Sequence, residues 1–324
     1  MAWHVFSTAA AAPRMTMTRV IYHLPPGSAP AGGVNTMIEH ARILRRAGIE
    51  SYAYARDRTG LPSHLLDDPV LLFGDIQITN SDLLIRSEVT PIDTLRAAGA
   101  AGCRQAIFVQ NHFYAVPVLA LAPGFEDLGI CGVIASSEAI AAFISGEFDL
   151  PDVPVVPYAV ETPPEVPAKR PAIAYMPRKR GFEARFIRDL VDHRLTDQDA
   201  PDWVKIDNLP ADEALRRVAE CSVFLSLQRF EGFGLPALEA MGQGCLACGF
   251  TGLGGRDYAQ AQNGYWVDED DLIGAADAVV EAWHGLSAGD PSTIARISKG
   301  REMAACFDAV RRDRRLLEVV RNLL

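Results

Sequence analysis

Residues 231–239 of this 324-residue chain read EGFGLPALE, which places two carboxylates, two glycines and a proline in one short stretch. Pro236 suits the first position of a helix, because an N–H in the first helical turn has no partner within the helix. The amides of residues 233–235 would then project from the positive end of that helix, where phosphate groups bind. Gly232 and Gly234 would let a ligand approach the backbone closely.

The two carboxylates of this stretch flank the start of the predicted helix. Glu231 precedes it, and Glu239 lies about one turn into it, roughly 6 Å along the axis at ~1.5 Å per residue. Each carboxylate can accept two hydroxyl hydrogens at once, and the neighbouring hydroxyls of a sugar or ribose offer that pattern. The stretch therefore favours a sugar nucleotide as ligand over an ordinary turn with two surface acids.

The E-x7-E spacing with an internal GFGLP resembles the donor-site signature of retaining GT-B glycosyltransferases of the GT4-like group. The resemblance implies that Glu231 contacts the donor sugar and Glu239 the ribose. It implies that the sugar and diphosphate are also bound by Gly232, Phe233, Gly234 and Leu235. The implied reaction moves a sugar from a nucleoside diphosphate sugar to a saccharide or small-molecule acceptor, in polysaccharide or glycoconjugate assembly, with retained anomeric configuration.

Residues 175–181, YMPRKRG, place three cations where the first strand of the C-terminal half is predicted to end. Ligands of open parallel sheets bind at this end of a strand. The resemblance implies that Arg178, with Lys179 or Arg180, neutralises the leaving diphosphate. The family usually has a glycine before the arginine and several residues between the arginine and the lysine. This chain has Pro177 and adjacent cations instead, so either Lys179 or Arg180 could make the second contact. A solvated basic turn is the alternative.

Other segments resemble the family with lower specificity. His112 follows a predicted strand, near the family's histidine that faces the reacting sugar, although a histidine there is often structural. Gly33, before a predicted helix, could bring its amide to a diphosphate or acceptor. Thr251 and Gly252 would line the donor pocket. Ser136 and Ser137 are interpreted as a helix cap.

Strands and helices alternate twice along the chain, which predicts an α/β fold with two Rossmann-like parallel-sheet lobes. Strands are predicted in the first half at residues 20–24, 51–55, 83–86, 106–110, 132–135 and 153–156. The resemblance implies the GT-B arrangement, in which the lobes face a cleft. We expect an acceptor lobe at 17–165, a donor lobe at 166–306, and a C-terminal helix at 307–324 that crosses back to the first lobe.

The composition of the chain argues against several other classes of protein. The chain is 49% hydrophobic and 22% charged with a net charge of −10, which argues against nucleic-acid binding and against electrostatic docking on anionic membranes. A hydrophobic patch could still contact lipid, but no apolar run is long enough to span a membrane. Six cysteines among mostly apolar neighbours suit reduced thiols in the cytoplasm. The C-x2-C pair at 245 and 248 favours a strand over zinc or redox chemistry, and residues 1–15 are interpreted as a disordered leader.

We expect no metal and no cofactor besides the donor substrate. No D-x-D motif is tied to a strand end, and the acidic run at 268–271 is interpreted as a helix cap. Three alternatives share the predicted fold: a sugar phosphorylase, another enzyme that processes nucleotide sugars, and a non-catalytic partner protein.

Overall fold

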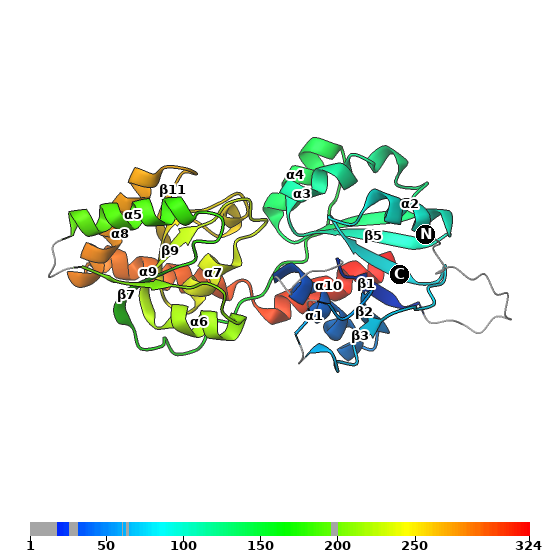
Figure 1. The fold of residues 1–324 in the computed structure, drawn as a ribbon, viewed down its shortest axis with the longest axis horizontal. Coiled ribbons are helices and arrows are strands. Elements are labelled where there is room, and N and C mark those ends of the chain that lie inside the picture. Colours follow the sequence, from blue (N-terminus) through cyan, green and yellow to red (C-terminus); the bar gives the residue numbers. More distant parts are fainter. Residues whose placement is uncertain (1–17, 26–31, 60, 63–64, 196–199) are drawn as a thin grey trace. The chain divides into compact units, whose positions relative to one another are not determined.

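The computed structural model describes residues 18–25, 32–59, 61–62, 65–195 and 200–324 (Figure 1). The chain forms two compact units. Unit 1 comprises Met1–Pro157 together with Arg312–Leu324, and unit 2 comprises Tyr158–Arg311. The predicted leader lies outside the described residues.

Unit 1 is built on a six-stranded parallel sheet in the order β3-β2-β1-β4-β5-β6. Its strands are β1 (Val20–His23), β2 (Ser51–Ala55), β3 (Leu71–Phe73), β4 (Leu83–Ser87), β5 (Arg104–Val109) and β6 (Ile130–Ala135). Its helices are α1 (Gly32–Arg46), α2 (Ile92–Ala100), α3 (His112–Leu119) and α4 (Glu138–Phe148), with a 3-10 turn η2 (Ala122–Gly124).

Two details of unit 1 differ from the prediction. The short strand β3 was not predicted. The strand predicted at 153–156 was wrong, because that segment forms only an isolated bridge between Val155 and Ala135. Pro154 and Pro157 have no N–H to donate, so the segment cannot continue a ladder along β6.

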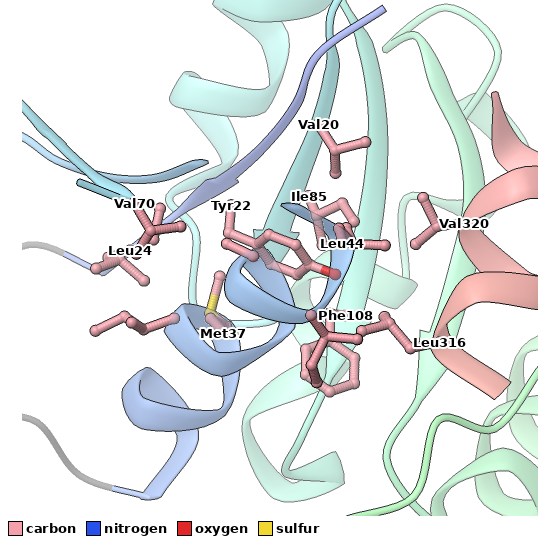
Figure 2. Packing of buried hydrophobic residues seen from close by; sticks show 14 of the residues in the cluster. Val20, Tyr22, Leu24, Met37, Leu44, Val70, Ile85, Phe108, Leu316 and Val320 are labelled. Atoms are coloured by element: carbon pink, nitrogen blue, oxygen red, sulfur yellow. The ribbon is translucent and has the colours of Figure 1, made fainter. Parts of the chain in front are cut away.

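The core of unit 1 includes the C-terminal helix α10 (Ala309–Leu323). Leu316, Val319 and Val320 are buried at helical spacing and share one hydrophobic cluster with the sheet and α1. Figure 2 shows Leu316 and Val320 pointing toward the same group of side chains as Phe108 and Leu44. Each such buried side chain contributes about 2 kcal/mol. The prediction that the C-terminal helix returns to the first lobe is confirmed.

Unit 2 is built on a five-stranded parallel sheet in the order β11-β10-β9-β7-β8. Its strands are β7 (Arg170–Tyr175), β8 (Asp202–Lys205), β9 (Cys221–Leu227), β10 (Leu246–Phe250) and β11 (Gly264–Val267). Its helices are α5 (Gly181–Arg194), α6 (Ala211–Ala219), α7 (Leu235–Gly242), α8 (Leu272–Ser287) and α9 (Pro291–Ala305), with a 3-10 turn η3 (Gly254–Asp257). One hydrophobic cluster packs α5 and α8 on one face of the sheet, and another packs α6, α7 and α9 on the opposite face (Figure 1).

Each sheet contains a point where the order of the strands reverses. In unit 1 the chain runs outward from β1 to β3 and then returns to place β4 on the other side of β1. In unit 2 it places β8 on one side of β7 and β9 on the other. In open parallel sheets the loops that follow such a pair of strands diverge, and ligands bind between them.

The described residues contain no helix that is long and apolar enough to cross a membrane. None of the six cysteines forms a disulfide, and Cys248 lies within β10 as predicted. Cys131 and Cys306 are exposed, which the apolar character of the surrounding sequence did not indicate.

Candidate functional site

The turn into α7 requires a glycine at position 234. Gly234 precedes the helix with φ +80°, in the left-handed region, and a Cβ there would lie 1.8 Å from Oε1 of Gln228. The helix begins at Leu235, so Pro236 is its second residue, one position later than predicted. Proline is accommodated at this position as well, because the N–H groups of the whole first turn lack partners within the helix.

Buried side chains hold this turn from inside. The Gly234 carbonyl accepts hydrogen bonds from the Tyr258 hydroxyl at 2.7 Å and from Nε2 of Gln228 at 3.4 Å, and Gln228 also donates to the Tyr258 hydroxyl at 2.6 Å. The Phe233 ring packs against Tyr158, Tyr258 and Phe307 with centroid distances of 5.1, 5.5 and 5.4 Å. The start of α7 is therefore anchored to the core of unit 2.

The glycine turn after β10 lies directly against residues 232–234. A Cβ on Gly254 would lie 2.0 Å from the carbonyl oxygen of Gly232, and a Cβ on Gly252, at φ +61°, would lie 2.9 Å from Oε1 of Gln228. Thr251, next to Gly252, is half-buried. The structure thus brings the predicted pocket residues Thr251 and Gly252 beside the EGFGLPALE stretch.

Glu231 lies on the loop after β9 and faces the loop after β7, at the strand reversal of unit 2. Its Oε1 is 3.4 Å from Nζ of Lys179 and 4.0 Å from a guanidinium nitrogen of Arg178. Lys179 also donates to the carbonyl of Phe230 at 3.2 Å. Arg178 and Phe230 have φ +34° and +50°, a conformation that non-glycine residues rarely adopt. Such strained backbone is concentrated at binding sites.

Arg180 has a different environment from the other two cations, and here the sequence-based assignment needs correction. Its guanidinium has no exposed surface, donates to Asp270 at 2.6 Å and to Glu269, and lies 4.5 Å from the Phe250 ring centroid. Its Nε donates to the carbonyl of Gln228 at 3.1 Å. Arg180 therefore stabilises the loop after β9 and offers no free surface to a donor.

The acidic run at 268–271 directly follows β11, so its D-x-D stands at a strand end, contrary to the prediction. The run has two structural roles. Asp271 accepts a hydrogen bond from the Gly274 amide at 2.8 Å and caps α8, as predicted. Glu269 and Asp270 pair with Arg180, which the sequence did not reveal. Among the described residues, no group of three or more His, Cys, Asp or Glu side chains has a geometry suited to a metal ion.

Glu239 is a half-buried carboxylate one turn into α7. Burial raises its pKa, the charge of Glu161 adds to that effect, and the charge of Arg178 opposes it. Within the part of the chain that the structure describes, no hydrogen bond or ion pair engages this carboxylate. Both oxygens can therefore accept hydroxyl hydrogens from a ligand.

Two predicted site residues belong to unit 1. The Gly33 carbonyl accepts a hydrogen bond from Nε2 of Gln110 at 3.2 Å, which ties the start of α1 to the end of β5. His112 begins α3, is buried against Phe113 and Phe143, and has a pKa lowered by that burial. Neither ring nitrogen of His112 hydrogen-bonds to another described residue.

Sequence reasoning missed Gln228 and Tyr258, which anchor the Gly234 carbonyl. Gln228 directly follows β9, so its position at the carboxyl end of a central strand was the available signal. Tyr258 carried no such signal. Ser137, interpreted as a helix cap, does accept a hydrogen bond from the Ile140 amide at 3.1 Å at the start of α4.

No protein-family model matches the chain. A curated protein called alpha-1,6-glucosyltransferase, from Actinobacillus pleuropneumoniae serotype 7 (strain AP76), is 23% identical over 261 residues, which cover 78% of this chain and 79% of that protein. This similarity extends over parts of both units.

Solved structures share the fold at low sequence identity. The pneumococcal O-GlcNAc transferase GtfA, in complex with UDP and GlcNAc, has a TM-score of 0.72 and 10% identity over 95% of this chain and 99% of its own. Anabaena HepE, in complex with UDP and glucose, has a TM-score of 0.69 and 13% identity over 94% and 100%. The chain spans about 55% of the length of TarM, with a TM-score of 0.55 and 16% identity over 76% of this chain.

Proposed function

We propose that this chain, a GT-B glycosyltransferase of the GT4 type, transfers a hexose from a UDP-hexose to a hydroxyl of a saccharide or small-molecule acceptor, with retained anomeric configuration. The proposal rests on one observation. Arg178 and Lys179 lie beside Glu231, which stands in the loop just before α7, at the strand reversal of unit 2. UDP as the nucleotide is supported by its presence in the complexes of GtfA and HepE. Glucose as the sugar is supported by the name of the Actinobacillus relative.

The diphosphate would be held by two cations and by backbone amides. Arg178 and Lys179 are more than two-fifths exposed, at 58% and 43%, so both can reach a ligand. The amides of residues 233–235 lie at the positive end of α7, which favours an anion. Fixed donors of this kind stabilise charge that develops on the leaving phosphate. We therefore propose that the reaction proceeds without a divalent metal ion.

The two carboxylates of the motif would hold the two sugar rings of the donor. Glu239, whose oxygens lack protein partners among the described residues, would accept hydrogen bonds from the ribose hydroxyls. Glu231 would accept hydrogen bonds from the transferred sugar while Arg178 and Lys179 turn to the diphosphate. We assign Glu231 no role as nucleophile, and we propose that the leaving phosphate accepts the acceptor's proton on the same face of the sugar.

Calorimetric titration with UDP-glucose, GDP-glucose and dTDP-glucose tests the donor site. The wild-type protein should bind UDP-glucose, and saturation at ~100 times the dissociation constant should raise the unfolding free energy by ~2.7 kcal/mol. Arg178→Ala should lose most of this binding. Arg185→Ala is the matched control, because Arg185 is an exposed arginine of α5 in the same unit and should bind the donor like the wild type.

Transfer is measured separately by following UDP release with saccharide acceptors. Retention is read from the anomeric proton of the product by nuclear magnetic resonance. A protein that binds UDP-glucose but releases no UDP would instead be a non-catalytic binder. Release of a sugar phosphate in the presence of inorganic phosphate would identify a phosphorylase.

A further inference from the structure

Glu88 is a buried carboxyl at the strand reversal of unit 1. It directly follows β4, the strand that lies on the other side of β1 from β2, and its exposed fraction is 5%. It therefore stands at the carboxyl end of the sheet, at the position where the topology of unit 1 places a ligand. Gln228 occupies the corresponding position in unit 2, directly after β9.

The carboxyl group of Glu88 is only partly satisfied by the protein. Backbone amides of Glu88, Gln110 and Asn111 hydrogen-bond to it, whereas Oε2 is buried with no partner among the described residues. Burial raises the pKa of Glu88 to about 7. A carboxyl group in this range can accept a hydrogen bond when ionised and donate one when protonated. Leaving such a buried oxygen without a partner is unfavourable, so a ligand hydroxyl there would be stabilising.

Asp82, at the opposite end of β4, shows how a structural carboxylate is held in the same unit. Its side chain is 2% exposed, and both oxygens are engaged. Oδ1 accepts from Arg19 at 2.8 Å, and Oδ2 accepts from Arg19 at 2.7 Å and from the Thr79 amide at 2.8 Å. Glu88 differs from Asp82 because its Oε2 has no hydrogen-bond partner among the described residues.

Hydrogen bonds around Glu88 connect the end of β4, the end of β5 and the start of α1. Two of the three amides that hold its carboxyl, those of Gln110 and Asn111, directly follow β5. The Gln110 side chain reaches from there to the Gly33 carbonyl at the start of α1. His112, whose ring nitrogens are also unpartnered among the described residues, follows two positions after Gln110. Polar groups without partners thus gather at the carboxyl end of β4 and β5.

We propose that Glu88 is an acceptor-binding residue, and that its Oε2 hydrogen-bonds to a hydroxyl of a pyranoside acceptor. The inference rests on the proposed glycosyl transfer, since it assigns the acceptor of that reaction to unit 1. A hydroxyl suits the site because it can both donate and accept a hydrogen bond, as the carboxyl can. A metal ion would require more ligands, and the described residues bring no further acid or thiol to Glu88 in a metal-binding group.

Binding of methyl α-D-glucopyranoside tests this assignment without requiring turnover. Saturation-transfer difference spectra are recorded in the presence of UDP for the wild type, Glu88→Gln and the control Asp82→Asn. The wild type and Asp82→Asn should show the sugar signal. Glu88→Gln should bind about tenfold more weakly, because the amide nitrogen that replaces Oε2 can only donate and carries no charge. Equal binding by all three proteins, or no binding by the wild type, would overturn the proposal.

Kinetics then separate this inference from the proposed function. With UDP-glucose as donor, Glu88→Gln should raise the KM for the glucoside while leaving the KM for UDP-glucose and the slow hydrolysis of UDP-glucose unchanged. A rise in both KM values, or a loss of hydrolysis, would assign Glu88 to folding and contradict the acceptor role. If the wild type neither binds nor hydrolyses UDP-glucose, the proposed function fails, whereas the sugar-binding spectra still decide whether Glu88 contacts the glucoside.

Discussion

Replacing Gly234 by alanine should damage the donor site through a defined steric conflict. Position 234 has φ +80°, and holding alanine in the left-handed region costs about 1–2 kcal/mol. The new methyl group would also lie 1.8 Å from Oε1 of Gln228, so Gln228 must move. Its hydrogen bonds to Tyr258 and to the Gly234 carbonyl would then be lost, at about 1 kcal/mol each. The total destabilisation should be about 3–4 kcal/mol.

Gly289→Ala is the matched control for this prediction. Gly289 also has a positive φ, +63°, but a Cβ there meets nothing within 4 Å, so alanine should cost only the backbone term of about 1–2 kcal/mol. Both residues belong to unit 2, which carries Trp203, Trp266 and Trp283, so urea unfolding followed by tryptophan fluorescence reports on this unit. UDP binding by calorimetry should fall at least tenfold in Gly234→Ala and stay unchanged in Gly289→Ala. Equal destabilisation of the two variants, with wild-type UDP affinity, would refute the bracing of α7 by Gln228.

Further predictions concern charge and protonation. Glu231→Gln should reduce turnover more than UDP affinity, because its contact is to the transferred sugar, and unchanged turnover would exclude that contact. Glu239→Ala should weaken UDP binding by ~1.5–3 kcal/mol at most in a calorimetric titration, and an unchanged affinity would place the ribose elsewhere. Arg178→Ala should lower turnover by a factor of ~10²–10³, while excess EDTA should leave wild-type turnover intact. Loss of activity in EDTA with recovery in manganese would contradict the metal-free reaction. Because burial raises the pKa of Glu88 from 4.5 to about 7, the folded state holds a proton that the unfolded state releases, and stability is lost as pH rises through this window. The unfolding free energy of the wild type, relative to Glu88→Gln, should therefore fall by about 3 kcal/mol between these pH values, and a flat difference would refute the shifted pKa.

The donor-site motif could be predicted from the sequence because its chemistry is local. Glu231 and Glu239 fall around the start of α7, and the glycine that the turn requires is part of the same stretch. The role of Arg180 could not be predicted in this way. Its partners Glu269 and Asp270 lie about ninety positions away, and only the packing of α8 on α5 brings them to the guanidinium.

Two strand predictions failed, one because the strand is very short and the other because the apolar segment contains prolines. β3 has only three residues, too few for a periodic signal, and it is held by pairing with β2. The apolar segment around Val155 was predicted to form a strand, but it forms only an isolated bridge, because its prolines have no N–H to donate to a ladder. Glu88 gave no signal at all, because its burial depends on the end of β5 lying beside the end of β4.

A crystal structure with bound UDP-glucose, grown with EDTA, would reveal which residues hold the donor and whether a metal ion is needed to hold it. We predict that the diphosphate contacts Arg178, Lys179 and the amides of residues 233–235. Glu239 should contact the ribose, and Glu231 should contact the glucose. A nucleotide bound away from the strand reversal of unit 2, or a diphosphate with no contact to Arg178 or Lys179, would contradict this prediction.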